Sequence, residues 1–491
     1  MLSAVIVGAG FSGLCAGIQL RRLGITDFVI LEKADRVGGT WRENTYPGAA
    51  CDVPSHLYSY SFEPNPSWSR AYGGQAEILA YLEHCADKYG LRGHIKFGQK
   101  VDEARFDDQT GSWQLKTASG ERIETRALML GNGALHIPSL PDIPGLASFQ
   151  GTTFHSARWN HDYDLAGKRV AVIGTGASAI QFVPQIQPDV ARLDLYQRTA
   201  PWVVPKRDRV MSSAERWMFE HVPATHWLRR TGLYWLMESR VVGFAYAPKI
   251  NELLEKIVLR YLATAVEDPE LRRTLTPNYR FGCKRVLISN DWYPALQQDN
   301  VDVITDPIES ITPRGVRTKA GVERAVDALI LGTGFKVTDY LSSIDIVGSG
   351  GVSLNDAWRA SLRNYLGITV SGFPNLFLLM GPNTGLGHTS MIFMIEAQAR
   401  YAARAVSLMQ EQNLASIDVR PSVEQAFKTE LAARMKNTVW ATGCQSWYQT
   451  PDGEVFLWPA ATFDYWWRTR KVELADFQQV ALAPARTRRA A

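Results

Sequence analysis

Two glycine-rich turns, each placed directly after a short apolar run, most constrain what this 491-residue chain can fold into. The apolar runs cover residues 4–10 and 169–173, and the turns cover residues 8–13 and 174–179. A strand before such a turn and a helix after it form the context in which backbone N–H groups and the helix N-terminus bind a pyrophosphate. The sequence therefore predicts two dinucleotide-binding units. The candidate contacts are Gly8, Gly10, Ser12 and Gly13 in the first turn, and Gly174, Gly176 and Ser178 in the second.

The residue at the end of the next apolar run distinguishes the two nucleotides. Residues 28–31 end at Glu32, and a carboxylate there accepts hydrogen bonds from a ribose diol while repelling a 2′-phosphate. Residues 193–196 are followed by Arg198 and Thr199, where a guanidinium can pair with a phosphate through two hydrogen bonds. The second unit is therefore predicted to bind NADP rather than NAD.

The length and the order of the elements predict an α/β fold with two Rossmann-like dinucleotide-binding domains. Residues 95–128 have the pattern of short strands in a meander, which is common in FAD-binding folds, so the first unit is assigned to FAD. We expect an FAD-binding domain in two parts, residues 1–145 and 326–491. The NADP-binding domain is expected to cover residues 146–325 and to carry a helical insertion at about residues 212–278. This insertion either caps an active site or packs against its own domain.

Charge and cysteine content exclude several classes of protein. The chain has 53 basic and 49 acidic residues, and the resulting net charge of +4 does not suggest a nucleic-acid partner. The cysteines lack the close pair of a redox-active disulfide, and the histidines lack metal-ligand spacing, so no metal is expected. The first strand begins by Ala4, and no apolar run is long enough to span a membrane. We therefore expect a cytoplasmic protein, whose oligomeric state the sequence leaves open.

A loop and a linker carry the most specific motifs. The loop reads Gly38-Gly39-Thr40-Trp41, four residues, Tyr46-Pro47-Gly48, three residues, Asp52. The linker reads Phe149-Gln150-Gly151, three residues, His155, three residues, Trp159-Asn160. With these motifs and the two turns, the chain resembles the type I Baeyer-Villiger monooxygenases, class B flavoprotein monooxygenases that use NADPH and oxygen to convert ketones into esters or lactones. Asn160 departs from the proline or aspartate usual in that family, but the loop motif separates the chain from the sister flavin-containing monooxygenases.

The resemblance implies which residues bind the two cofactors. It places Glu32, Thr40, Trp41, Asp52, Tyr58, Val101 and Met391 around FAD, and Arg198, Thr199 and Lys284 around the 2′-phosphate of NADP. It also makes Arg285 the catalytic arginine that follows the phosphate-binding lysine. Phe149, Gly151, His155 and Trp159 of the linker are expected to position other groups rather than to touch substrate.

A fixed cation suits the chemistry that the resemblance implies. Reduced flavin and O2 form a C4a-peroxide, which attacks a ketone carbon only as the anion. The permanently charged guanidinium of Arg285 would keep that peroxide unprotonated and would stabilise negative charge on the former carbonyl oxygen. Asp52 would hold Arg285 in place. The expected partners are therefore a small ketone and O2.

Other functions remain open at this point. A flavin-containing monooxygenase that oxidises nitrogen or sulfur atoms uses the protonated hydroperoxide and does not need Arg285. An NADPH-sensing or uncoupled flavoprotein would give no oxygenated product. The sequence does not identify the ketone, because the pocket walls are expected to come from the inserted helices, from residues 385–391 and from C-terminal aromatic residues.

Overall fold

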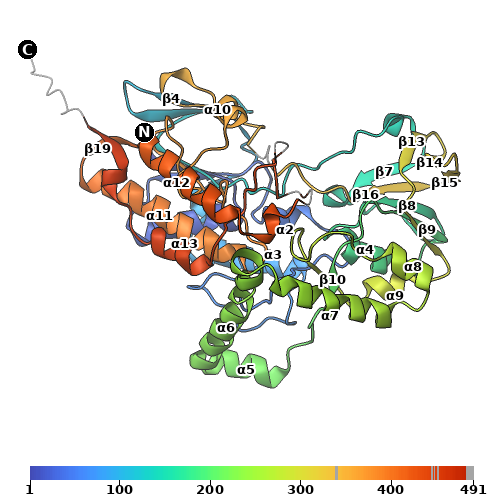
Figure 1. Ribbon diagram of the computed structural model, residues 1–491. Coiled ribbons are helices and arrows are strands. Elements are labelled where there is room, and N and C mark those ends of the chain that lie inside the picture. Colours follow the sequence, from blue (N-terminus) through green and yellow to red (C-terminus); the bar gives the residue numbers. More distant parts are fainter. Residues whose placement is uncertain (338–340, 444–445, 447, 451–452, 483–491) are drawn as a thin grey trace, which may run out of the picture.

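A computed structural model describes residues 1–337, 341–443, 446, 448–450 and 453–482. Two α/β units lie side by side, and Figure 1 shows the first at the left, in blue, orange and red, and the second at the right, in teal and yellow. The green helices of the insertion lie below and in front of them. The expected α/β fold with two Rossmann-like units is confirmed.

An eight-stranded sheet forms the first unit. The turn of residues 8–13 follows β1 (Leu2–Val7), whose last four residues are buried, so its apolar side chains place the turn at the carboxyl edge of the sheet. β6 (Arg122–Leu130) pairs in parallel with β1 through its second half and antiparallel with β5 (Ser112–Thr117) through its first half. The strand order is β17-β4-β5-β6-β1-β2-β3, with β18 also on β6. The remaining strands are β2 (Phe28–Leu31), β3 (Ile95–Lys96), β4 (Val101–Asp107), β17 (Asp345–Val347) and β18 (Leu376–Leu378).

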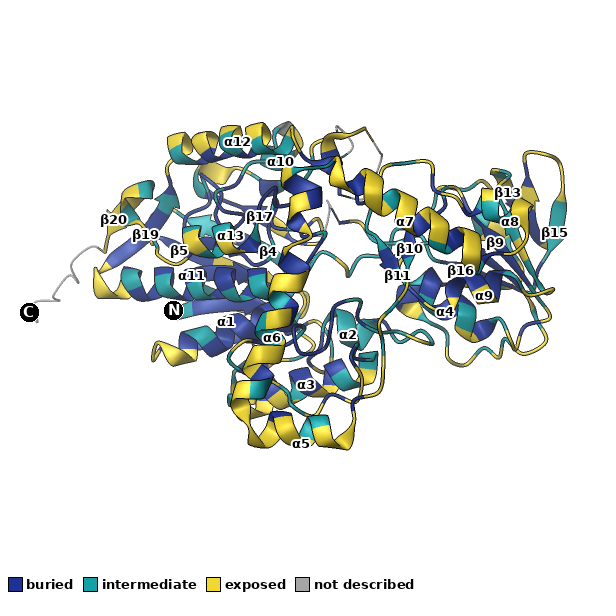
Figure 2. Ribbon diagram, turned by 60° about the horizontal axis from the view of Figure 1, so that its bottom comes forward, coloured by how far each residue is buried: buried dark blue, intermediate teal, exposed yellow. Residues whose placement is uncertain are grey.

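Helices cover this sheet, and their inner faces form the largest hydrophobic core. α1 (Phe11–Arg22) packs against α11 (Met391–Glu411), and both helices are dark blue in Figure 2 along the side that meets the sheet. The other helices of this unit are α2 (Thr40–Glu43), α3 (Gln75–Lys88), α10 (Leu354–Ala360), α12 (Pro421–Met435) and α13 (Thr462–Arg468). Short 3-10 turns are η1 (Arg92–His94), η5 (Ser349–Gly351), η6 (Val439–Ala441) and η7 (Leu474–Asp476), and a β-ribbon joins β19 (Leu414–Val419) to β20 (Phe477–Ala481).

A five-stranded parallel sheet forms the second unit, in the order β12-β9-β8-β16-β7. Its strands are β7 (Thr152–His155), β8 (Arg169–Ile173), β9 (Arg192–Tyr196), β12 (Val301–Ile304) and β16 (Ala328–Leu331). One face packs on α4 (Ala179–Ile186) and α9 (Trp292–Leu296), and the other packs on a small antiparallel sheet. That small sheet contains β13 (Ile308–Thr312), β14 (Gly315–Thr318) and β15 (Glu323–Ala325). The remaining elements are η2 (Leu146–Ser148), η3 (Ser156–Arg158) and the paired strands β10 (Val203–Val204) and β11 (Leu287–Ile288).

The strand pairing shows where the chain passes between the units. β16 pairs with both β8 and β7, so the second sheet extends to Leu331, beyond the boundary expected after residue 325. The buried apolar run of β16 gave no sign of which sheet it would join. β17 and β18 then pair with β4 and β6, which brings the chain back to the first sheet.

The insertion is helical, as expected. It contains α5 (Ser213–His221), α6 (Pro223–Glu238), the π-helical turn η4 (Val242–Tyr246), α7 (Ile250–Ala265) and α8 (Pro269–Thr274). α5 begins with a capping box, in which Ser212 and Glu215 each bind the other's backbone N–H. Among the described residues, no helix is both long enough and apolar enough to cross a membrane.

Candidate active site

A large cavity of about 2010 Å³ lies between the two units. Its walls include most of the predicted site residues from both units. Those residues are Thr40, Trp41, Asp52, Tyr58 and Met391 from the predicted FAD set, Gly174, Gly176, Ser178, Arg198, Thr199 and Lys284 from the predicted NADP set, and Arg285.

The two glycine turns leave helix N-termini open to an anion. Neither α1, which begins after Gly10, nor α4, which begins after Ser178, has a side chain that caps its first N–H groups. A Cβ on Gly13 would lie 1.8 Å from the carbonyl oxygen of Gly8, and one on Gly174 would lie 2.4 Å from that of Gly332. Only glycine permits this close packing of turn, strand and helix. Both turns therefore fit the pyrophosphate of a dinucleotide.

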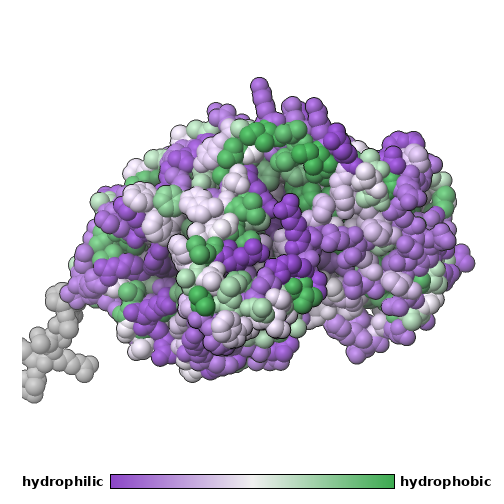
Figure 3. Space-filling model, turned by 90° about the horizontal axis from the view of Figure 1, so that it is seen from below, coloured by the Kyte–Doolittle hydropathy of each residue, from purple (hydrophilic) through white to green (hydrophobic). Residues whose placement is uncertain are grey.

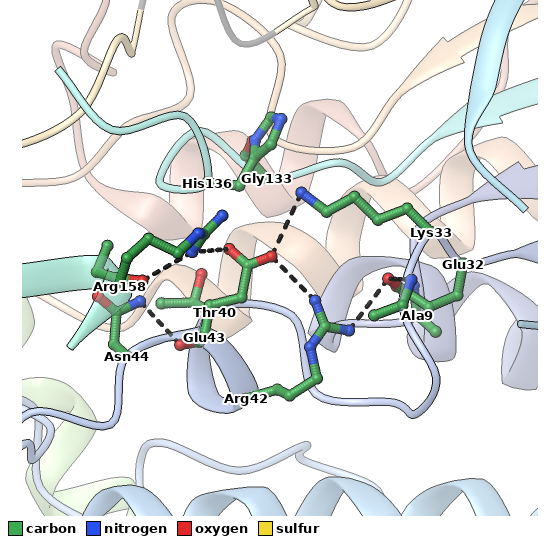
Figure 4. Close-up of polar contacts among 12 residues, drawn as sticks. Ala9, Glu32, Lys33, Thr40, Arg42, Glu43, Asn44, Gly133, His136 and Arg158 are labelled. Atoms are coloured by element: carbon green, nitrogen blue, oxygen red, sulfur yellow. Dashed lines mark hydrogen bonds and ion pairs between the residues drawn. The ribbon is translucent and has the colours of Figure 1, made fainter. Parts of the chain in front are cut away.

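Glu32 lies where β2 ends beside the first turn, and it is buried. Its carboxylate accepts hydrogen bonds from the backbone N–H groups of Ala9 at 2.8 Å and Ala34 at 2.9 Å. Figure 4 shows the guanidinium of Arg42 between Glu32 and Glu43, at 3.1 Å and 2.9 Å from their oxygens. These contacts hold the carboxylate rigidly beside the turn. Gly8, Gly10, Ser12, Gly13 and Glu32 do not line the large cavity, so the first turn lies outside it.

Glu43 extends this network toward the second unit, a link that the sequence did not reveal. Lys33 lies 3.3 Å and Arg158 lies 3.5 Å from its carboxylate (Figure 4). Burial would raise the pKa of Glu43, but the charges of Lys33, Arg158 and Arg42 hold it below its usual value. Glu43 therefore remains ionised and joins the loop motif to the linker motif.

Trp41 and Tyr58 form one aromatic wall of the cavity. The indole Nε1–H of Trp41 donates to the hydroxyl of Tyr58 at 3.1 Å, and the two rings meet edge to face. Burial raises the pKa of Tyr58 above its usual value, so its hydroxyl stays protonated. A flat apolar wall with a fixed polar group suits an aromatic ring system such as a flavin.

Asp52 and Arg285 form a bidentate ion pair across the two units. The Nε and Nη2 atoms of Arg285 lie 2.6 Å and 2.7 Å from the carboxylate oxygens of Asp52, and both side chains are about one-quarter exposed, toward the cavity. Burial alone would lower the pKa of Arg285, but the charge of Asp52 and the hydroxyl of Tyr448 raise it above its usual value. Burial would likewise raise the pKa of Asp52, and Arg285 lowers it. Both groups therefore stay ionised, and the guanidinium of Arg285 keeps its positive charge beside the cavity.

Lys284 and Arg198 are two cations in the wall of the same cavity. Lys284 lies over the ring of Tyr279, with Nζ 4.6 Å from the ring centroid. Burial and then the charge of Arg198 lower the pKa of Lys284, which shows that the two cations repel each other. In the described part of the chain, neither forms an ion pair with a carboxylate. Such a site fits a phosphate group.

The linker residues lie away from the cavity. His155 is buried, and its Nδ1 accepts a hydrogen bond from the N–H of Ala157 at 3.1 Å, which caps η3. Burial lowers the pKa of His155, so the ring is neutral. Trp159 packs against Phe154 and Phe182, and a Cβ on Gly151 would lie 2.5 Å from the ring of Phe149.

The middle of the loop motif contacts the second unit directly. Gly48 has φ of +76°, and a Cβ there would lie 2.9 Å from the carbonyl oxygen of Gln181 on α4. The side chain of Gln181 accepts from the hydroxyl of Tyr46 and the N–H of Ala50, and donates to the carbonyl of Ala50. The Tyr-Pro-Gly part of the motif thus fixes the two units against each other.

The lining of the cavity differs in part from what the sequence suggested. Val101 begins β4 and packs in the core of the first sheet, outside the large cavity like Glu32 and the first turn, and its contact with FAD stays a prediction. Tyr448 lines the cavity beside Arg285 and was missed, because nothing distinguished it from other C-terminal aromatic residues. Residues 385, 386, 389 and 391 line the cavity as expected, whereas no described residue of the helical insertion does.

Comparison with known proteins shows which family and fold this chain shares. Residues 5–217 match the family model described as pyridine nucleotide-disulphide oxidoreductase. The solved structure of an oxidised steroid monooxygenase bound to NADP superimposes with a TM-score of 0.88 at 31% identity, covering 97% of this chain and 99% of that one. The cyclohexanone monooxygenase of Rhodococcus sp. Phi1 bound to NADP+ gives a TM-score of 0.89 at 28% identity, covering 98% and 99%.

Two curated relatives decide the family. A Baeyer-Villiger monooxygenase from Pseudomonas aeruginosa is 47% identical over 475 residues, which cover 96% of this chain and 90% of the relative. A Baeyer-Villiger monooxygenase from Streptomyces coelicolor is 47% identical over 485 residues, which cover 98% and 93%. Likeness at this level over almost the full length of both chains shows common family membership. The chain therefore belongs to the Baeyer-Villiger monooxygenase family.

Proposed function

We propose that this protein is an FAD- and NADPH-dependent Baeyer-Villiger monooxygenase, which inserts one oxygen atom of O2 next to the carbonyl of a ketone to give an ester or a lactone. The observation that carries the proposal is the Asp52–Arg285 pair in the wall of the cavity between the two units. Family membership and the NADP-bound structures of related monooxygenases support it.

The residues present fit both cofactors. We assign the first unit to FAD, with the turn at the N-terminus of α1 for the pyrophosphate, Glu32 for the ribose, and Trp41 and Tyr58 beside the flavin. We assign the second unit to NADP, with the N-terminus of α4 for its pyrophosphate and with Arg198, Thr199 and Lys284 for the 2′-phosphate. The charges of Arg198 and Lys284, which form no ion pair with a carboxylate of the described residues, support the preference for NADPH over NADH.

When bound, FAD reduced by NADPH supplies the activation of O2. The chain supplies a fixed cation. Because Asp52 holds Arg285 by two hydrogen bonds and raises its pKa, the guanidinium stays charged when water leaves the cavity. Its charge then stabilises the negative charge that develops on the carbonyl oxygen of the ketone during oxygen insertion. The hydroxyl of Tyr448 helps to orient the same guanidinium.

Replacement of Arg285 tests this proposal. Because ester formation needs the cation and flavin reduction does not, Arg285→Ala should reduce ester formation by roughly 100-fold or more, while NADPH still reduces the flavin. Product analysis by gas chromatography and stopped-flow reduction of the flavin measure the two steps. Arg280→Ala is the matched control, since Arg280 lies in the same segment but is exposed and pairs with Glu252 and Glu255. Undiminished ester formation by Arg285→Ala would exclude the proposed role.

A sulfide substrate separates this function from heteroatom oxidation. If Arg285→Ala loses ester formation but keeps sulfoxide formation, the cation serves ketone oxidation specifically. Wild-type protein that oxidises sulfides and no member of a ketone panel would contradict the proposal. The proposal would also be contradicted if the protein consumed NADPH at the same rate with and without ketone and formed no oxygenated product.

A further inference from the structure

Helix α7 exposes an apolar stripe that nothing in the described chain covers. Ile250, Leu253, Leu254 and Ile257 follow the spacing i, i+3, i+4, i+7 and are 46%, 62%, 36% and 54% exposed. The adjacent side of the helix is anchored by Val258 and Leu262, which are buried. Folding of this chain therefore buries only part of the apolar surface of α7.

The turn η4, which contacts α7, continues this exposed surface. We define the helical face as the stripe of α7 together with Val242 and Tyr246 of η4, which are 43% and 57% exposed. Figure 3 shows hydrophobic side chains gathered near the upper edge of its view, which is the front of Figure 1, where α7 lies. An exposed apolar surface of this extent marks a contact with another phase or another molecule.

The charges around the helical face are segregated. Lys249, Lys256 and Arg260 follow the spacing i, i+7, i+11, which places them in the row directly beside the apolar stripe. All three are exposed, and among the described residues none of them forms an ion pair. The acidic residues of α7, Glu252 and Glu255, lie on the far side of that basic row and pair with Arg280.

The helical face is thus apolar along α7 and η4 and cationic along one border, which Lys249, Lys256 and Arg260 form.

The apolar stripe and its basic border together indicate which partner binds the helical face. A second copy of the chain, docked through the same face, would bring the unpaired basic residues of both copies together, which is unfavourable. A bilayer surface with anionic headgroups instead pairs with the basic border, and its headgroup region accepts Trp, Tyr and aliphatic side chains. We propose that the helical face docks on the surface of membranes that contain anionic phospholipids, without spanning them. The role of the helical insertion is then peripheral membrane binding rather than formation of the cavity wall.

Vesicle binding by the wild-type holoenzyme tests the proposal without any variant. We expect the protein to float with vesicles of phosphatidylcholine and phosphatidylglycerol, to bind vesicles of phosphatidylcholine alone much more weakly, and to dissociate as the salt concentration rises. Absence of binding to the phosphatidylglycerol vesicles, or equal binding to both compositions at all salt concentrations, would overturn the proposal.

Paired variants locate the binding surface. Lys249→Gln with Lys256→Gln should weaken partition into the anionic vesicles by roughly 25-fold, since each basic residue near the surface contributes about fivefold. Leu253→Ser with Ile257→Ser should weaken it by about tenfold or more. The controls replace equally exposed residues elsewhere, Lys116→Gln with Lys319→Gln and Val322→Ser with Val480→Ser, and these should bind like wild type. Equal loss in the controls and in the helical-face variants would overturn the assignment of the surface.

Sedimentation velocity tests the competing occupant. If the helical face binds lipid, the wild type and the Leu253→Ser/Ile257→Ser variant should show the same oligomeric state. An oligomer that this variant dissociates, combined with no vesicle binding by the wild type, would assign the face to a second copy instead.

Discussion

Arg198 and Lys284 form an arrangement that is unfavourable until an anion arrives. Burial and then the charge of Arg198 lower the pKa of Lys284, so each cation destabilises the other. A phosphate bound between them reverses this repulsion. The two residues therefore contribute to selectivity, because they favour binding of a nucleotide that carries the 2′-phosphate over binding of one that does not.

Removal of one cation should affect NADPH and leave NADH unchanged. Because a charge-assisted hydrogen bond contributes about 1.5–3 kcal/mol, Arg198→Ala should raise the KM for NADPH roughly 10- to 150-fold. Steady-state kinetics with both nucleotides measure the effect, with kcat/KM for NADH as the internal reference. Arg314→Ala, at a position that is 81% exposed, is the control. An equal loss with both nucleotides would show that Arg198 does not contact the phosphate.

At the scale of elements, the loop motif is a contact between units as much as a cofactor site. Gly48 lies against α4, and Gln181 binds both sides of the same loop. The sequence predicted a functional loop here but not its partner, because residues that are far apart in sequence leave no local pattern when they touch.

Gly48 offers a test of this contact against a matched glycine. Gly48→Ala and Gly24→Ala both place a side chain at positive φ, which costs about 1 kcal/mol each, but only Gly48 has atoms within 4 Å of the new Cβ. Gly48→Ala should therefore lose about 1–3 kcal/mol more of unfolding free energy than Gly24→Ala. Thermal unfolding measures the difference. Equal losses would show that α4 and the loop separate at little cost.

The strands of both sheets could be predicted, and much of the rest could not. Apolar runs that end in glycine turns have a strong local signal, so residues 28–31 and 169–173 match β2 and β8. The short helix α2 inside the loop has no apolar periodicity and was not predicted. The sheet that β16 joins depends on tertiary pairing, which leaves no local pattern in the sequence. The contact between Arg285 and Asp52 was predicted from the family resemblance and not from any periodicity in the sequence.

At the scale of the whole molecule, the helical insertion is fastened to the first unit by a buried polar cluster. Glu238 of α6 accepts a hydrogen bond from the hydroxyl of Thr462 at 2.8 Å, and its carboxylate lies 3.3 Å from Nε2 of His388. Burial would raise the pKa of Glu238, but its contacts with His388 and Thr462 hold it below the usual value of 4.5.

This cluster predicts a pH-dependent stability. Because the folded-state pKa of Glu238 is lowered, its contribution is fully present above about pH 4.5 and is lost as the pH falls through the lower folded value. Glu238→Gln should cost about 1–3 kcal/mol of unfolding free energy at pH 7, and the gap to wild type should narrow in acid. Urea unfolding at several pH values measures this. Glu220→Gln, on exposed α5, should change little, and a gap that is constant with pH would contradict the assignment.

The Asp52–Arg285 pair joins side chains that the chain supplies from opposite halves, 233 positions apart. Neither half can assemble the reactive centre alone, however well it folds. Chimeras that combine halves from two relatives would therefore pair a carboxylate from one parent with a guanidinium from the other. Their turnover rate would show how well the new interface restores the two hydrogen bonds between these groups. The activity of such chimeras thus depends on the interface between the halves rather than on either half alone.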